Sequence, residues 1–215
     1  MGETLTAEDV RREAVAAMGS QLGEIYHLLS DQVSWLHLKW DTLCELFANR
    51  ETVDLLNSAA PAFFHELQRQ MREDIFLHLC RVTDPPISGG KSTLTLRRLP
   101  GLVSNRAMRL KLEAMVDNAV KGTAFARDWR NRRLAHTELS QSQPLASASR
   151  KQAEDALDAI RKVMNQLEQT YLNKTVSYQH TIPDLGGVAS LIAVIRKGVD
   201  TRRADREAKI RGDVA

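Results

Sequence analysis

The feature of this chain that most constrains its fold is a run of apolar side chains spaced four residues apart. The run consists of Phe63, Leu67, Met71, Ile75 and Leu79. This spacing places the side chains along one face of an α-helix, where they can be buried together. A Pro-Pro pair at positions 85 and 86 ends the run, because proline does not continue a helix beyond its first turn. The segment therefore predicts a long helix with one buried face.

Weaker forms of the same period predict further helices along most of the chain. We expect them at about residues 7–30, 32–48, 102–120, 123–139 and 150–174. Thr6 marks the first helix start, and Ser149 with Gln152 can form a capping box for the last. Residues 94–99 fit either a helical turn or an extended segment, and we find no internal repeat and no convincing pair of strands. The sequence therefore predicts an all-α protein, a bundle of antiparallel helices.

The composition indicates a folded protein of the cytoplasm. Hydrophobic residues make up 43% of the 215 residues, which is enough for a sizeable core. No apolar run approaches the ~20 residues that cross a bilayer, and the N-terminus lacks the pattern of a signal peptide. Cys44 and Cys80 do not have the spacing of a disulfide framework, so we expect free thiols in a reducing compartment. These features predict a cytoplasmic location and no membrane partner.

Positive charge is concentrated in the middle of the chain. Residues 91–133 contain eleven Lys or Arg and three acidic residues, a net charge of +8, whereas the whole chain carries +3. The remainder is therefore at −5. A basic segment in an otherwise acidic protein is typical of a surface that binds an anion, with nucleic acid the first candidate. Solvated helix faces paired with the acidic remainder are the alternative.

Two short motifs resemble binding signatures but lack a required residue. Residues 88–93 contain Gly-Lys-Ser, yet Pro85 stands where a phosphate-binding P-loop needs glycine, and a helix precedes the segment. His65 and Glu66 begin like a zinc-protease motif, but Arg69 stands where the second His is needed. No cluster of His, Cys and Asp suggests a closed metal site. We therefore expect neither a metal nor a cofactor.

Residues 127–138 carry the strongest chemical signal in the sequence. They read Arg-Asp-Trp-Arg-Asn-Arg-Arg-Leu-Ala-His-Thr-Glu, so that His136 lies near four arginines on a predicted helix. A His titrates near neutral pH and can move protons. An Arg can hold a phosphate and stabilise the charge that develops on it. Together they suffice to cleave RNA through its own 2′-hydroxyl without a metal, although a basic surface helix with a locally packed His is the alternative.

This segment resembles the signature of HEPN domains, a family named for nucleotide binding in higher eukaryotes and prokaryotes. The signature is an Arg, usually a polar residue next, and a His after four to six intervening residues in all. Arg130, Asn131 and His136 fit it with five intervening residues. The form Arg-Asn-Arg-Arg-Leu-Ala-His is similar to that of abortive-infection proteins of the AbiU type. Upstream segments that look like this subfamily lie at residues 40–47, 53–57, 63–64, 80–84 and 94–96, so the resemblance covers roughly residues 30–175.

The resemblance implies a fold, a partner and an activity. The fold is an antiparallel helical bundle of the HEPN type, expected over residues 1–178, with a C-terminal helix and charged tail over residues 184–215. Such domains form homodimers in which two Arg/His motifs face each other. Many are ribonucleases that act in phage defence or as toxins, which gives RNA as the substrate and an antitoxin or another protein as a further partner.

The resemblance also implies roles for individual residues. His136 would be the acid/base group, Arg130 would hold the scissile phosphate and Asn131 would orient one of them. Three further arginines would track the RNA backbone, which is a salt-sensitive role. They are Arg127, Arg132 and Arg133. Upstream, Arg81 and Asp84 match the subfamily, and we expect them to pair with each other or to cap a helix rather than to do chemistry.

Two details depart from the pattern. On an ideal α-helix, Arg130 and His136 lie about 120° apart, so Arg132, four residues before the His, is a second candidate for the phosphate. Relatives silenced by a nucleotidyltransferase usually have Tyr two residues after the His, where this chain has Glu138. The first interpretation is a homodimeric endoribonuclease. The alternatives are a non-catalytic module that binds RNA, nucleotide or a protein, and a structural adaptor.

Overall fold

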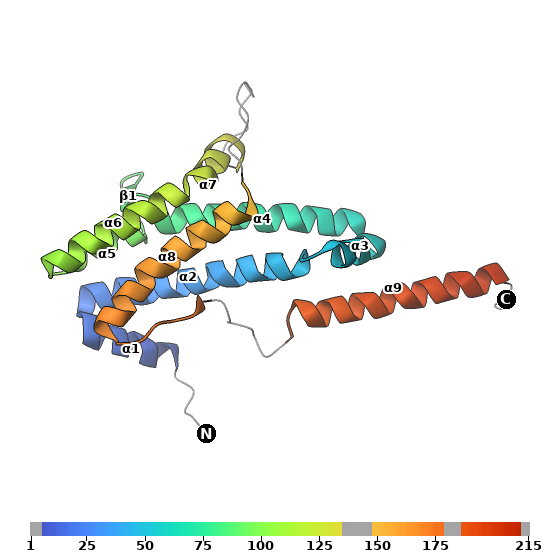
Figure 1. The fold of residues 1–215 in the computed structure, drawn as a ribbon, viewed down its shortest axis with the longest axis horizontal. Coiled ribbons are helices and arrows are strands. Elements are labelled where there is room, and N and C mark those ends of the chain that lie inside the picture. The colour runs from blue at the N-terminus through green and yellow to red at the C-terminus, as the bar shows by residue number, and fades with distance from the viewer. Residues whose placement is uncertain (1–5, 135–147, 179–185, 212–215) are drawn as a thin grey trace. The chain divides into compact units, whose positions relative to one another are not determined.

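The computed structural model describes residues 6–134, 148–178 and 186–211, and most of them are helical (Figure 1). The helices are α1 (Ala7–Met18), α2 (Ser20–Leu46), α3 (Arg50–Ala59), α4 (Pro61–Thr83), α5 (Leu99–Leu102), α6 (Arg106–Gly122), α7 (Ala124–Trp129), α8 (Arg150–Tyr171) and α9 (Val188–Arg211). A 3₁₀ turn, η1 (Leu96–Arg98), precedes α5, and a π-helical turn, η2 (Arg130–Leu134), follows α7. The prediction of an all-α protein is confirmed.

A short hairpin interrupts the helices after α4. Strands β1 (Ile87–Ser88) and β2 (Lys91–Ser92) pair antiparallel, with Ile87 opposite Ser92. Gly89 and Gly90 connect them with φ angles of 57° and 75°, which suits glycine in a tight hairpin turn. The segment that resembled a phosphate loop is therefore a β-turn. Two-residue strands are too short to leave an alternating pattern, which is why the sequence did not predict this pair.

The chain forms two compact units, and we describe each separately. The first comprises residues 1–37 and 75–178, and the second comprises residues 38–74 and 179–215. The unit boundaries fall within α2 and α4. The division expected from the sequence, with a domain over residues 1–178 and a C-terminal piece over residues 184–215, stays a prediction.

The first helical segment of the chain is broken at a glycine. The sequence predicted one helix over residues 7–30, whereas the structure has α1 and α2 with Gly19 between them at φ 82°. The predicted start of α1 is confirmed, since Thr6 forms a capping box with Asp9. Gly23 lies against the backbone of α1, and a Cβ there would be 2.6 Å from Cα of Val15. Glycine therefore allows the break at position 19 and the close approach of the two helices at position 23.

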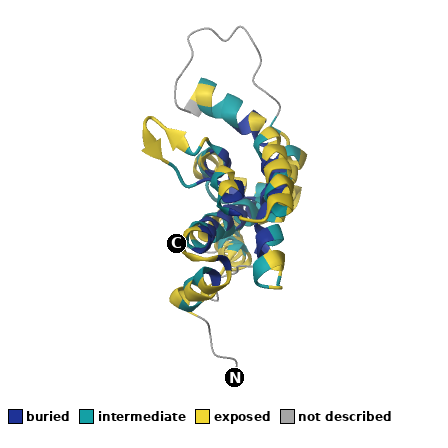
Figure 2. Ribbon diagram, turned by 90° about the vertical axis from the view of Figure 1, so that its left-hand side faces the viewer, coloured by how far each residue is buried: buried dark blue, intermediate teal, exposed yellow. Residues whose placement is uncertain are grey.

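The core of the first unit lies between α2, α4, α6 and α8. Helix α8 begins at the predicted capping box of Ser149 and Gln152 and packs along α6. In Figure 2 the ribbon is coloured by burial, with the buried residues in dark blue. Fully buried members of this core are Leu29 and Leu36 of α2, Ile75 and Leu79 of α4, Leu112 of α6, and Ile160, Met164 and Leu167 of α8.

A buried polar cluster also joins α2 to α8 in the first unit. The hydroxyl of Tyr26 donates a hydrogen bond to Glu168, whose carboxyl is buried and therefore has a raised pKa. The ring of His37 stacks on Tyr178 at a centroid distance of 5.6 Å. Burial, and secondarily the nearby Arg161, lowers the pKa of His37 to about 4. His37 is therefore a neutral core residue at physiological pH.

The second unit has a small apolar core of its own. Leu46 of α2, Leu56 of α3 and Phe64 of α4 form its buried centre. Leu67 and Met71 of the four-residue run pack on it, together with Val188, Ile192 and Ile195 of α9. Phe63, the first residue of that run, is 62% exposed and meets Phe64 edge to face. Across the described part of the chain, no helix combines the length and the apolar character needed to cross a membrane.

Candidate active site

The arginine-rich segment starts on α7 and continues into a π-helical turn. Phe76 of α4 packs edge to face against Phe125 and Trp129, and this fixes α7 on α4. The α-helix ends at Trp129, and residues from Arg130 adopt the wider π form. The helix predicted over residues 123–139 is therefore α-helical to Trp129 and π-helical over residues 130–134, and its last five residues lie outside the described part of the chain. The 120° separation calculated for an ideal α-helix does not apply to a π turn, which is frequent at functional sites.

Arg130, the predicted phosphate-binding residue, is held by two neighbours. Its Nη1 donates hydrogen bonds to both carboxylate oxygens of Asp84, at 2.9 and 2.7 Å. Its Nε donates to the side-chain oxygen of Asn131 at 3.2 Å. Among the described residues, none accepts a hydrogen bond from Nη2. Arg130 is therefore fixed through Nε and Nη1, and within the described residues its Nη2 has no acceptor.

Asp84 reaches Arg130 because the end of α4 is fixed. Thr95 donates from its hydroxyl to the main-chain oxygens of Val82, at 3.1 Å, and of Asp84, at 2.7 Å. Arg98 donates to the main-chain oxygen of Pro86 at 2.6 Å. The chain just after α4 is thus tied to the segment before α5. Asp84, for which we expected no chemical role, is the ion-pair partner of Arg130.

Arg127 has a structural role in the same cluster, because its guanidinium links several segments of the chain by hydrogen bonds. Nη2 donates to the main-chain and side-chain oxygens of Thr83, at 2.9 and 2.6 Å. Nη1 donates to the main-chain oxygen of Val120, at 3.0 Å, and to the hydroxyl of Thr123, at 2.9 Å. Only 21% of its side chain is exposed, and burial lowers its pKa. These contacts join the end of α4 to the junction of α6 and α7.

The other predicted site residues differ in exposure. Asn131 and Arg133 are exposed. Arg132 lies 3.6 Å from Asp128, one turn earlier, and only 18% of its side chain is exposed. His136 lies outside the described residues, as does Glu138. The structure thus brings Arg127 and Arg130 to Asp84, with Asn131 in contact with Arg130.

The cluster offers an anion-binding group rather than a metal site. Within residues 6–134, 148–178 and 186–211, no group of three His, Cys, Asp or Glu side chains is arranged to hold a metal ion. Burial raises the pKa of Cys80, beside the cluster, to about 11, so its thiol stays protonated. What remains is the guanidinium of Arg130, which can donate to a phosphate oxygen while Asp84 fixes its orientation.

Sequence reasoning missed Asp84 and Thr83, which hold the arginines in place. The only signal was their position in the Arg-Val-Thr-Asp stretch at the end of the predicted helix. Contacts between residues 46 positions apart, such as Asp84 with Arg130, do not follow from spacing along the chain.

Comparison with known proteins agrees with the resemblance seen in the sequence. No curated protein and no solved structure matches the chain. A family model described as AbiU2, of the HEPN type, matches residues 19–191, which include α2 through α8 and every predicted site residue. This match covers well over half of the chain, so the protein belongs to the AbiU2 family of HEPN domains.

Proposed function

We propose that this protein is a metal-independent endoribonuclease in which Arg130 and His136 carry out the chemistry. The observation that carries the proposal is the fixed guanidinium of Arg130. It is held by Asp84 and Asn131, its Nη2 has no acceptor among the described residues, and it lies six residues before His136 in the sequence. Membership of the AbiU2 family supports this assignment, and the family context suggests a toxin or phage-defence effector.

The proposed reaction uses a nucleophile supplied by the substrate. The imidazole of His136 takes the proton from a ribose 2′-hydroxyl, and the 2′-oxygen attacks the adjacent phosphorus. The bond from phosphorus to the 5′-oxygen breaks, and an imidazolium returns a proton to that leaving oxygen. Arg130 stabilises the negative charge on the phosphoryl oxygens during transfer. The products are a 2′,3′-cyclic phosphate and a 5′-hydroxyl end.

The surrounding residues have different proposed roles. Asn131 and Asp84 orient Arg130, and Asp84 is thus a positioning residue. Arg133, which is exposed, contacts the RNA backbone, and Arg132 does so if it exchanges Asp128 for a phosphate. Arg127 has its donors on protein oxygens, so we assign it to positioning rather than to RNA. We propose a homodimer that brings two such sites together, as in related domains.

A non-catalytic binding module is the second candidate. The ion pair with Asp84 favours it, because a carboxylate on Nη1 neutralises part of the charge that Arg130 would offer to a transition state. In that case the same surface binds RNA, a nucleotide or a partner protein such as an antitoxin without cleaving it. The two functions differ in one observable, the cutting of RNA.

Cleavage of end-labelled RNA in excess EDTA separates these functions. We expect the purified protein to cut, and His136→Ala and Arg130→Ala to lose at least 100-fold in rate, the scale of lost acid–base or charge stabilisation. Arg106→Ala, at the exposed start of α6, is the matched control and keeps full activity. Binding by all four proteins without cleavage would instead establish the module.

A further inference from the structure

Helix α9 carries apolar side chains in its first two turns and mostly charged side chains after them. In its first two turns, the partly buried side chains of Val188, Ile192 and Ile195 pack against the core of the second unit. From residue 196 to residue 211 it has seven basic and three acidic residues, a net charge of +4. The proposed nuclease site lies in the first unit and uses none of these residues.

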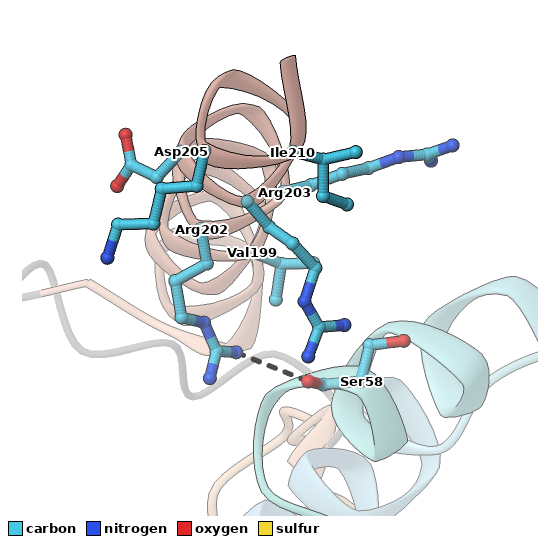
Figure 3. Close-up of a pocket in the computed structure, with 8 residues that line it drawn as sticks. Ser58, Val199, Arg202, Arg203, Asp205 and Ile210 are labelled. Carbon is cyan, nitrogen blue, oxygen red and sulfur yellow. Dashed lines mark hydrogen bonds between the residues drawn. The ribbon is translucent and has the colours of Figure 1, made fainter. Parts of the chain in front are cut away.

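A basic groove forms where the charged half of α9 meets the C-terminal end of α3. The groove has a volume of about 910 Å³. Helix α9 lines it with Arg202, Arg203, Arg206 and Lys209, and α3 contributes Ser58. Figure 3 shows Arg202 pointing from α9 toward the main-chain oxygen of Ser58. One acidic residue, Asp205, and the aliphatic side chains of Val199 and Ile210 complete the lining, so the groove has four basic residues and one acidic residue.

Two arginines fix α9 against α3. Arg202 donates to the main-chain oxygens of Ser58 and Ala59, at 3.2 and 3.4 Å. These oxygens belong to the last turn of α3, which lacks helical donors, so Arg202 acts as its cap. Arg196 forms an ion pair with Glu51 at 2.9 Å. The guanidinium groups of these two residues therefore have partners within the protein.

The remaining cations of the groove are available to a ligand. Arg203 contacts Glu207 one turn later at 3.2 Å, an exposed pair that costs little to exchange. Among the described residues, none forms a hydrogen bond or ion pair with Arg206 or Lys209. Both side chains are exposed, and they lie three residues apart on one side of α9. Within the described part of the chain, the groove thus presents two cations without a partner, beside the single acidic residue Asp205, on a helix that α3 holds in place.

We propose that this groove, the α9 basic groove, binds the phosphate backbone of single-stranded RNA through Arg206, Lys209 and Arg203. The choice of RNA rests on the proposed function, which brings that polyanion to the protein. Successive cations on one helix face suit a ligand with repeated negative charge, and such contacts release counterions. None of the described residues that line the groove is aromatic, so we expect binding there to be independent of base sequence.

The test compares two double variants that remove the same charge. In the full chain carrying His136→Ala, which prevents cleavage, Arg206→Gln with Lys209→Gln removes two groove charges. Lys197→Gln with Arg72→Gln removes two exposed charges of the same unit outside the groove. The affinity for a labelled 20-nucleotide single-stranded RNA is measured from 50 to 200 mM salt. The four charged residues that are replaced are exposed, and circular dichroism checks folding.

We expect the groove variant to bind about tenfold more weakly at 100 mM salt, and the control to change less than twofold. The slope of log affinity against log salt should become shallower by about 1.4 in the groove variant, because each lost single-strand phosphate contact contributes about 0.7. Equal losses in both variants, or no loss in the groove variant, would overturn the proposal.

The outcome is separable from that of the proposed function. If the protein binds RNA through the groove but never cuts it, the groove proposal stands and the nuclease proposal fails. If the protein cuts RNA while the groove variant binds RNA normally, the nuclease proposal stands and the groove proposal fails.

Discussion

Replacing Arg127 tests whether this arginine stabilises the fold or contacts RNA. Arg127→Met keeps the length of the side chain but removes four hydrogen bonds, to two oxygens of Thr83, one of Val120 and one of Thr123. Charged donors contribute about 1.5–3 kcal/mol each. Because 21% of the Arg127 side chain is exposed, water can replace some of the lost hydrogen bonds. The hydroxyls of Thr83 and Thr123 also keep their own hydrogen bond, at 3.0 Å. We therefore expect a loss of about 3 kcal/mol in the free energy of unfolding.

Thermal unfolding followed by circular dichroism measures this loss. At roughly 2–4 °C per kcal/mol for a chain of this size, Tm should fall by roughly 6–12 °C. Arg133→Met is the matched control, because Arg133 is exposed and lies on the same segment. Its Tm should stay within about 2 °C, equivalent to the ~0.5 kcal/mol typical of surface changes, while its RNA affinity falls. If Arg127→Met keeps its Tm and weakens RNA binding as much as Arg133→Met, the structural assignment of Arg127 is refuted.

Three further predictions concern Asp84, His37 and Gly23. Asp84→Asn removes the charge that orients Arg130, so kcat at saturating RNA should fall about tenfold, or ~1.4 kcal/mol. A faster variant would show instead that Asp84 competes with the phosphate. His37 has a pKa of about 4 when buried, below its unfolded value near 6.5, so the unfolded chain takes up the extra proton first. Stability should therefore fall by roughly 3 kcal/mol from pH 7 to pH 4 in urea titrations, with a smaller fall in His37→Gln; identical pH profiles would contradict this. Gly23→Ala places a Cβ 2.6 Å from Val15 and should lower stability by about 2 kcal/mol, whereas Gly198→Ala, in open space, should not; equal stabilities would contradict the close packing of α1 on α2.

Local patterns in the sequence predicted most of the helices, because capping and apolar periodicity act over a few residues. The capping residues Thr6 and Ser149 mark the starts of α1 and α8 as expected. The break at Gly19 was missed because a single glycine is tolerated within a helical pattern, and only the observed positive φ shows that it ends one. The π turn after Trp129 likewise leaves no periodic signature.

The site was predictable only in part. The Arg/His signature located the segment, but three neighbouring arginines of the same type have different environments. Arg127 forms structural hydrogen bonds, Arg130 pairs with Asp84, and Arg133 is exposed. These differences arise from contacts with Thr83 and Asp84, more than 40 residues earlier in the chain. Sequence separation of this size gives no local signal, so the assignment of roles required the fold.

The central claim is tested most directly by one pair of substrates. The first is an RNA that the protein cuts, and the second is the same RNA with a single 2′-deoxy nucleotide on the 5′ side of the cut bond. Both are incubated with the protein in EDTA, and the product ends are identified by mass spectrometry. We predict 2′,3′-cyclic phosphate ends from the first RNA and no cleavage at that bond in the second. Cleavage of the deoxy-substituted bond, or activity that EDTA abolishes, would contradict a mechanism based on the 2′-hydroxyl, Arg130 and His136.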